Sequence, residues 1–244
     1  MQFSDIYSYS LIAIGICSSV YHYKGFATTG KFYNYSNSLT INANCGWLIQ
    51  EIPSFVFSLF FILHYGEKSF NTFALGLFAL HYFQRSLVYP NLLKPSKPIK
   101  LNYFISAFIF TSLNGYFQSH SLLREQEQIR ELNFLHIIGF FLFFFGFLSN
   151  IKADRILINL KTIYDTTYKI PRGYLFEYVS SANYFSEMIE WLGFALVAQN
   201  LTSFAFFLFI AFYLSARGIS YHKWYLEKFE DYPKSRKAII PFLL

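Results

Sequence analysis

Four ionisable side chains lie within stretches of this sequence that are otherwise apolar enough to cross a lipid bilayer: Glu51, Arg85, Glu187 and Glu190. An ionisable group at the centre of a membrane helix costs about 2.5–3.5 kcal/mol on insertion scales, so such groups face one another, a cavity or a ligand. In apolar surroundings a carboxyl group can stay protonated and donate a hydrogen bond. These residues therefore predict a buried polar site. The alternative is that they are pairs that tie helices together.

Other polar residues lie at the spacing of an α-helix, where positions three, four and seven apart share a face. Two such sets are Tyr82, Arg85 and Tyr89, and Asn183, Glu187 and Glu190. Gln50 and Glu51 come about one turn after Trp47, and Asn114 and Gln118 are four residues apart in a further apolar stretch. Polar side chains are therefore expected to converge from several helices.

The elements that must position these residues are membrane helices. Of the 244 residues, 54% are hydrophobic and 14% are charged, against about 25% charged in a soluble domain. Apolar runs recur near the length of about 20 residues that a helix needs to span hydrocarbon. We expect an all-α integral membrane protein with seven transmembrane helices, at 6–22, 47–65, 72–90, 101–120, 133–150, 178–199 and 202–219. Residues 1–244 are expected to form a single domain, because no Gly-, Ser- or Pro-rich linker divides them.

The distribution of Lys and Arg predicts the orientation, because cytoplasmic loops accumulate basic residues. Sixteen of the 20 lie in the connections after the first, third and fifth spans and in the C-terminal tail, against three on the other side. The N-terminus is therefore expected on the non-cytosolic side and the C-terminus in the cytosol. Nearly all polar groups of the spans then fall in the cytosolic half, Asn114 and Gln118 excepted, which favours a pocket open to the cytosol. Attraction to anionic lipid would also explain why the Lys and Arg residues gather on the cytosolic side.

Several kinds of site are disfavoured. The six His form no HxxxH or HExxH arrangement and the two Cys lack metal-ligand spacing, so a metal is not expected. Neither GxGxxG nor GxxxxGK[ST] occurs, so a dinucleotide would bind without a Rossmann or P-loop cradle. A nucleic-acid partner is not expected. The long connection 151–177, of mixed charge, is either a binding segment for a phosphorylated soluble ligand or a solvated loop.

Four blocks of the sequence carry a resemblance to a known family. They are WLIQEIPSF from Trp47, HYFQRSLVY from His81, the segment Asn150 to Trp191 with SSANYFSEMIEW from Ser180, and FEDYPKSRKA from Phe229. In these blocks the chain resembles the steroid 5α-reductases, membrane enzymes that reduce 4-ene-3-oxosteroids with NADPH. The resemblance runs from the second predicted helix to the C-terminus and implies the same seven helices and orientation.

The resemblance also implies roles for particular residues. Glu51 and Tyr82 would be catalytic and would flank the 3-oxo group of the substrate. Trp47, Gln50 and Trp191 would line the steroid pocket. The NADPH contacts carried over by position are Arg85, Lys97, Asn150, Asp154, Lys161, Tyr168, Lys169, Asn183, Glu187, Arg217 and Tyr225.

The sequence departs from the family pattern at several positions. Lys97, Lys161 and Lys169 stand where relatives carry Arg, and a Lys keeps the charge but lacks the planar fork that binds a phosphate through two hydrogen bonds. Tyr221 stands where animal relatives have His, and Arg172 where relatives are often uncharged. Neither Tyr221 nor Arg172 is assigned a role.

The implied reaction transfers a hydride to C5 of the enone and drives negative charge onto the C3 oxygen. Tyr82 is the expected hydrogen-bond donor to that oxygen. Glu51 would either orient Tyr82 or donate a hydrogen bond itself as a protonated acid. The expected partners are NADPH, a steroid or other lipid-soluble enone, and membrane lipid. The membrane would be the endoplasmic reticulum in a eukaryote or the inner membrane in a bacterium.

Two other functions are weighed against this one. A related membrane enoyl reductase would act on a 2-enoyl-CoA or a polyprenal-type lipid, and the block from Asn183 to Trp191 would serve it equally. A seven-helix receptor or light-driven pump shares the outward N-terminus. The last predicted helix, 202–219, contains no Lys for a retinal Schiff base, which disfavours the pump.

Overall fold

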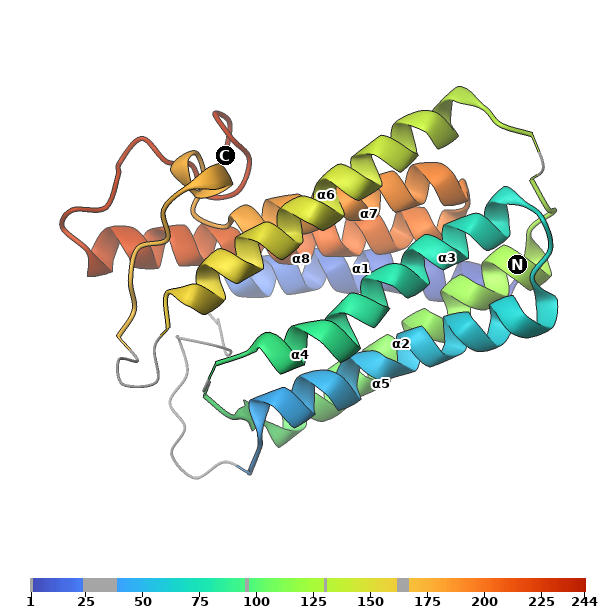
Figure 1. Ribbon diagram of the computed structural model, residues 1–244, viewed down its shortest axis with the longest axis horizontal. Helices are drawn as coiled ribbons and strands as arrows, with labels where there is room; N and C mark the ends of the chain where they lie inside the picture. Colours follow the sequence, from blue (N-terminus) through green and yellow to red (C-terminus); the bar gives the residue numbers. More distant parts are fainter. Residues whose placement is uncertain (1, 24–38, 95–96, 130, 162–166) are drawn as a thin grey trace. The chain divides into compact units, whose positions relative to one another are not determined.

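The computed structural model describes residues 2–23, 39–94, 97–129, 131–161 and 167–244, and these are mostly helical (Figure 1). The α-helices are α1 (Phe3–Tyr23), α2 (Ala43–Tyr65), α3 (Phe70–Phe83), α4 (Tyr89–Leu92), α5 (Leu101–His120), α6 (Phe134–Asn159), α7 (Ala182–Ala198) and α8 (Leu201–Lys228). The π-helices η2 (Gln84–Val88) and η3 (Ser121–Glu125) continue α3 and α5, and η4 (Tyr174–Glu177) is a 3-10 turn. The short strands β1 (Thr40–Ile41) and β2 (Ile99–Lys100) pair antiparallel.

A helix or a run of joined helices is present at each of the seven predicted spans. The predicted bounds 101–120 are those of α5, and the run from α3 through α4 covers 72–90. Among the described residues, four helices are long and apolar enough to cross a membrane, namely α1, α2, α6 and α8. Seven crossings and their orientation stay a prediction, and the loop charges Lys24, Lys31 and Arg130 lie outside the described residues.

Two helices extend further than their apolar stretches predict. α8 continues to Lys228 and α6 continues to Asn159, whereas the predicted spans end at residues 219 and 150. The last turns of α6 have tertiary packing of their own, because Ala153 is fully buried in a cluster with Phe176, Val179 and Ala182. Burial of this face stabilises the helix beyond the apolar stretch, since packing contributes more to helix stability than propensity does.

The contacts within the chain divide it into two compact units. The first unit comprises Met1–Tyr7, Asn34–Gly139 and Phe194–Phe204, and the second comprises Ser8–Tyr33, Phe140–Gly193 and Ala205–Leu244. The helices α1, α6, α7 and α8 each contribute residues to both units.

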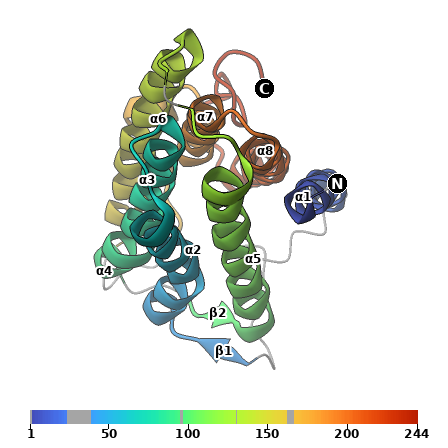
Figure 2. The same cartoon turned by 90° about the vertical axis from the view of Figure 1, so that its right-hand side faces the viewer.

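In the first unit, α2 packs against both α3 and α5 (Figure 2). The approach to α5 is close at Gly115, where an added Cβ would lie 2.6 Å from the Cα of Ser54. Side-chain hydroxyls join the two backbones: Ser54 Oγ donates to the Thr111 carbonyl at 2.7 Å, and Thr111 Oγ1 donates to the Gln50 carbonyl. Small residues and interhelical hydrogen bonds of this kind are the usual means by which helices associate in lipid.

In the second unit, α6 and α7 approach closely at Gly146, where an added Cβ would lie 2.6 Å from the Glu190 Cα and closer still to its main-chain nitrogen. The segment before α7 pairs with the C-terminal tail through an isolated parallel bridge between Val179 and Lys237. Hydrogen bonds from Ser180 N to the Lys237 carbonyl and from Lys237 N to the Tyr178 carbonyl, both 2.9 Å, form this bridge. The tail is therefore part of the fold of the second unit.

Candidate active site

The π-helix η2 places Arg85 against two aromatic rings of the first unit. A π-turn inserts one residue into an α-helix and frequently occurs at functional sites. The Arg85 guanidinium carbon lies 5.6 Å from the ring centroid of Trp47 and 4.8 Å from that of Tyr89. Arg85 is only 8% exposed, so these cation–π contacts hold a buried positive charge.

The expectation that Tyr82, Arg85 and Tyr89 share one helical face assumes a continuous α-helix. The segment η2 lies between Tyr82 and Tyr89 and changes the phase of the helix there. Tyr82 is 3% exposed, and its ring packs on Phe78 with 4.7 Å between centroids. Its hydroxyl oxygen accepts a hydrogen bond from Asn114 Nδ2 at 3.4 Å, so α3 and α5 meet at a polar contact.

The acid predicted to act with Tyr82 lies on α2. Gln50 Nε2 donates to Glu51 Oε1 at 3.1 Å, and Gln50 is buried whereas Glu51 is partly exposed. The other amide atom, Gln50 Oε1, has no hydrogen-bond partner among the described residues. A buried amide oxygen of this kind can accept a hydrogen bond from a ligand.

In the second unit, the predicted cofactor residues Asn150 and Asn183 are in contact. Asn150 Nδ2 donates to the Asn183 main-chain carbonyl at 2.9 Å, which joins α6 to the first turn of α7. Asn183 and Glu187 are one helical turn apart and are both partly exposed, whereas Glu190 is fully buried. Asn183 and Glu187 thus present an amide and a carboxylate along one side of α7.

Arg217 is surrounded by tyrosines. Its guanidinium donates to the hydroxyls of Tyr184, Tyr213 and Tyr221 at 3.3, 3.1 and 3.1 Å. The three phenol oxygens accept these hydrogen bonds and so orient the guanidinium. Sequence reasoning missed Tyr184 and Tyr213 and assigned no role to Tyr221. The sequence does display that Tyr213 and Tyr221 lie four residues before and after Arg217 on α8.

The remaining predicted cofactor residues differ in their surroundings. Lys97, Lys161, Tyr168 and Lys169 are exposed. The Tyr168 ring meets Trp224 edge to face at 5.1 Å. The exposed lysines are at the surface, where a water-soluble anion can reach them.

Three predicted site residues lie in packed surroundings within the second unit. Asp154 is 4% exposed. Trp191 is 1% exposed and packs on Phe206 with 4.6 Å between ring centroids. Tyr225 is stacked on Tyr232, with 5.1 Å between ring centroids and an interplanar angle of 11°. The roles of these three residues stay predictions.

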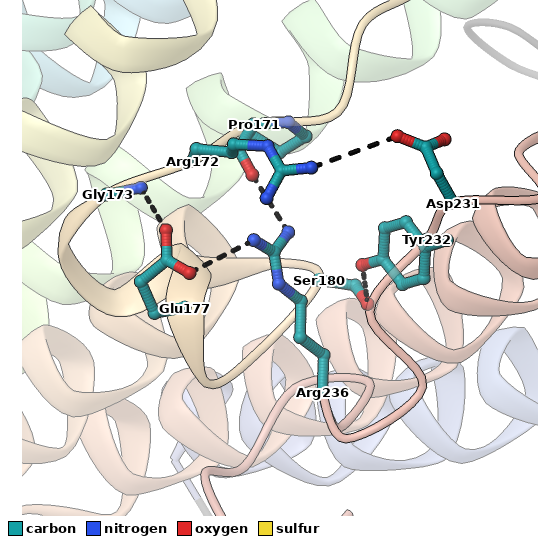
Figure 3. Close-up of polar contacts among 8 residues, drawn as sticks. All are labelled: Pro171, Arg172, Gly173, Glu177, Ser180, Asp231, Tyr232 and Arg236. Carbon is teal, nitrogen blue, oxygen red and sulfur yellow. Dashed lines mark hydrogen bonds and ion pairs between the residues drawn. The ribbon is translucent and has the colours of Figure 1, made fainter.

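The C-terminal tail is fastened to the segment that follows Lys169 by Arg236 (Figure 3). Arg236 is 2% exposed, and its Nη1 donates to the Pro171 carbonyl at 2.8 Å while its Nη2 lies 3.4 Å from Glu177 Oε2. Sequence reasoning assigned no role to Arg236. At the surface nearby, Arg172 forms an ion pair with Asp231 at 3.9 Å, which gives a partner to a residue that the sequence left unexplained.

The Glu177 carboxylate receives a second contact, from the Gly173 main-chain N–H. This hydrogen bond lowers the pKa of Glu177 below its usual value, and the charges of Arg236 and Arg172 act in the same direction, against an opposing effect of burial. The segment 171–177 is thus held in a defined conformation with Glu177 ionised.

Ser180 provides another connection to the tail. Its Oγ lies 2.6 Å from both His222 Nδ1 and the Tyr232 hydroxyl, and the contact with Tyr232 is drawn in Figure 3. With three polar neighbours, including the Lys237 carbonyl at 3.2 Å, Ser180 joins the start of α7, the end of α8 and the tail.

The predicted site residues therefore form two groups. The first unit contains Trp47, Gln50, Glu51, Tyr82, Arg85 and Lys97, and the second contains the others. The first group includes an acid and a phenol, which can donate hydrogen bonds to a ketone oxygen. The second includes cations (Lys161, Lys169 and Arg217) suited to phosphates and an amide–carboxylate pair suited to a carboxamide. This donor set fits a phosphorylated dinucleotide such as NADPH.

Comparison with known proteins gives the family. The family model described as 3-oxo-5-alpha-steroid 4-dehydrogenase matches residues 97–244. The chain is 43% identical over 223 residues to the mouse (Mus musculus) 3-oxo-5-alpha-steroid 4-dehydrogenase 1, covering 88% of this chain and 87% of the relative. The human (Homo sapiens) protein of the same name is 42% identical over 219 residues, covering 85% and 83%.

A second group of relatives gives the same result. The pig (Sus scrofa) 3-oxo-5-alpha-steroid 4-dehydrogenase 2 is 39% identical over 228 residues, which cover 89% of each chain. Identity of this extent covers most of the sequence, well beyond any single motif. The chain belongs to the 3-oxo-5-alpha-steroid 4-dehydrogenase family of oxidoreductases.

Proposed function

We propose that this protein reduces the C4–C5 double bond of a 4-ene-3-oxosteroid with NADPH, by hydride transfer to C5 and polarisation of the 3-oxo group. Family membership supports the reaction, since relatives about 40% identical over most of the chain are named for it. The observation that carries the assignment is the buried phenol of Tyr82, which accepts a hydrogen bond from Asn114 and so can direct its own proton toward a ketone.

The acid and the phenol act on the steroid. Hydride addition at C5 of a conjugated enone moves negative charge to the C3 oxygen, and a donor aimed at that oxygen lowers the barrier. Tyr82 is the donor, and Glu51, in contact with Gln50, orients Tyr82 or donates as a protonated acid. Trp47, Gln50 and Trp191 are the proposed pocket residues. The enolate then takes a proton at C4.

The cations and the amide–carboxylate pair hold the cofactor. Bound NADPH supplies the hydride. Lys161, Lys169 and Arg217 bind its phosphates, and Asn183 and Glu187 bind the carboxamide of its nicotinamide. Asn150 fixes the start of α7 through the Asn183 carbonyl and so positions that pair. The remaining proposed contacts are Arg85, Lys97, Asp154, Tyr168 and Tyr225.

The proposed setting is a multi-pass membrane. Seven spans, with the N-terminus on the non-cytosolic side and the active site open to the cytosol, follow from the excess of Lys and Arg in alternate connections. Four helices of suitable length and composition support this arrangement. A lipid-soluble enone would enter from the bilayer and NADPH from the cytosol.

The test is turnover by detergent-solubilised protein with NADPH and, in parallel, testosterone, progesterone and a 2-enoyl-CoA. We expect 5α-reduced steroid, with deuterium at C5 when the cofactor carries deuterium at C4 of the nicotinamide. Reduction of the enoyl-CoA with no reduction of either steroid would overturn the proposal in favour of a related enoyl reductase. Failure to bind NADPH at all would exclude both.

A further inference from the structure

A chain of hydrogen-bonded polar side chains in the first unit ends at the phenol of Tyr82. It comprises Tyr7 on α1, and Asn114 and Gln118 on α5, and it connects them to the Thr202 main-chain carbonyl. Asn114 and Gln118 are each 0% exposed. A buried amide costs free energy unless its hydrogen bonds are made, so the partners of these two amides fix how they are oriented.

The direction of each hydrogen bond in this chain follows from the contact between Gln118 and the Thr202 carbonyl. A main-chain carbonyl can only accept, so the contact of 3.0 Å with the Thr202 oxygen assigns the nitrogen of the Gln118 amide to that side. The same nitrogen lies 3.3 Å from one amide atom of Asn114, which must accept and is therefore Oδ1. The Tyr7 hydroxyl also donates to this oxygen, at 3.1 Å.

The other amide atom of Asn114 is then its nitrogen, and it faces Tyr82. An amide nitrogen can only donate, so the Tyr82 oxygen is the acceptor in the contact of 3.4 Å. The phenol proton is thereby directed to another acceptor. Hydrogen bonds in series polarise one another, so a phenol whose oxygen accepts from Asn114 is a stronger donor in its own right.

We infer that Asn114 is a positioning residue for the reaction, because it holds Tyr82 as the hydrogen-bond donor to the substrate ketone. This inference rests on the proposed function. Asn114 itself does not touch the reacting atoms; it acts through Tyr82, and Tyr7 and Gln118 act through Asn114. Preorganised donors of this kind act without the cost of reorienting during the reaction.

The direct test is Asn114→Asp. The new side chain has nearly the same shape and can still accept from Tyr7 and Gln118. Burial opposes its ionisation and a higher pH favours it, so the assay is run toward high pH, where the carboxylate presents an oxygen to Tyr82. The phenol would then donate to this carboxylate in place of the ketone. We expect kcat to fall by about 10- to 100-fold, less than the 10²–10³ typical of losing a donor outright, with little change in KM for NADPH.

Asn71→Asp is the matched control. Asn71 is 1% exposed and belongs to the same unit. Its amide bonds main-chain groups, donating to the carbonyls of Leu122 and Glu127 and accepting from the Ile129 nitrogen. This variant measures the structural cost of the same substitution. Asn114→Asp should lower kcat well beyond what Asn71→Asp does at an equal loss of thermal stability.

A second variant keeps the test decisive if Asn114→Asp does not fold. Tyr7→Phe preserves the ring, which is stacked on Phe117 at 4.4 Å between centroids, and removes only the hydroxyl that anchors Asn114. We expect a fall in kcat of a few fold (about 1 kcal/mol or less in the barrier). Tyr9→Phe, on the same helix and 58% exposed, is the control and should change nothing.

The effects must disappear when Tyr82 is replaced, because Asn114 and Tyr7 act through its hydroxyl. In a Tyr82→Phe background, neither variant should lower kcat further. Equal losses with and without the Tyr82 hydroxyl, or wild-type kcat in both variants, would overturn the inference alone. A wild-type protein that does not reduce the enone would overturn the proposed function and this inference with it.

Discussion

Arg236 Nη2 lies 3.4 Å from Glu177 Oε2, and the two residues are 59 positions apart in the chain. The guanidinium is buried, whereas the carboxylate side chain is 49% exposed. One end of the contact is therefore desolvated and the other remains in water. This asymmetry makes Arg236 the sensitive partner, because a buried charge that loses its partners is strongly destabilising.

Arg236→Lys should destabilise the protein even though it keeps the charge. The guanidinium contacts the Pro171 carbonyl and Glu177 with two different nitrogens, and a single ammonium group cannot reproduce that fork. We expect a loss of about 1–3 kcal/mol, the cost of a broken buried hydrogen bond, read as a lower midpoint of thermal unfolding in detergent.

Arg172→Lys is the control for Arg236→Lys. Arg172 pairs with Asp231 at 3.9 Å, and both side chains are exposed. Exposed pairs contribute about 0–1 kcal/mol, so this variant should unfold at nearly the wild-type temperature. Equal destabilisation by the two variants would contradict the stabilising role assigned to the contacts of the buried Arg236 guanidinium.

The lowered pKa of Glu177 predicts how stability depends on pH. A carboxyl whose pKa is lower in the folded than in the unfolded state stabilises the fold above its unfolded pKa, about 4.3 for Glu. That stabilisation is lost as the pH falls through the folded pKa. The Glu177→Gln variant should therefore unfold at a lower temperature than wild type at about pH 7. The difference between the two unfolding temperatures should shrink in acid. A difference independent of pH would contradict the assignment.

Hydropathy predicts the helices from the sequence better than it predicts their ends. The bounds of α5 coincide with the predicted span 101–120, although the π-helix η3 continues the helical run to Glu125. The end of α6 was not predictable in this way. Its last turns contain the charged residues Lys152 and Asp154, which predict the end of a membrane span. The helix continues because Ala153 packs on Phe176, a contact with a segment that is distant in the sequence.

The site residues show the same division between local and distant information. The sequence shows one Tyr four residues before Arg217 and another four residues after it. The third tyrosine, Tyr184, comes from α7, and its contact with Arg217 cannot be predicted from spacing along α8. The π-helix η2 at Arg85 is a property of backbone hydrogen bonding, which hydrophobic periodicity does not encode. Resemblance to a family supplied the roles of Glu51 and Tyr82, which spacing alone did not.

Gly146→Ala should destabilise the second unit, because its Cβ would lie 2.6 Å from the Glu190 Cα and closer still to the Glu190 main-chain nitrogen. Backbone atoms cannot move aside as a flexible side chain can. Overpacking costs about 1–3 kcal/mol, occasionally more. Gly76→Ala is the control, since an added Cβ there meets nothing within 4 Å and removal of a helical glycine can stabilise by about 0.5–1 kcal/mol. Thermal unfolding should rank the two variants on opposite sides of wild type.

Lys161→Glu should raise KM for NADPH and leave KM for the steroid nearly unchanged. Lys161 is exposed in the second unit, and a hydrogen bond from a charged group contributes about 1.5–3 kcal/mol, so we expect at least about a tenfold rise. Arg155→Glu is the control, because Arg155 is also exposed, on α6, and its replacement makes the same change in charge without a proposed contact. An equal rise in both variants would indicate a general electrostatic effect and contradict phosphate binding by Lys161.

Tyr82→Phe and Glu51→Gln separate the two groups proposed to act on the ketone. Phe keeps the ring that packs on Phe78 but removes the donor, so kcat should fall by about 10²–10³. Gln at position 51 keeps the shape and an N–H donor but has no acidic proton. A comparable fall in kcat would show that Glu51 donates a proton, and a small fall would show that Glu51 orients Tyr82. Single-turnover rates at saturating NADPH and steroid measure both. Full turnover in both variants would show that neither group polarises the ketone, and the proposed active site would then be wrong.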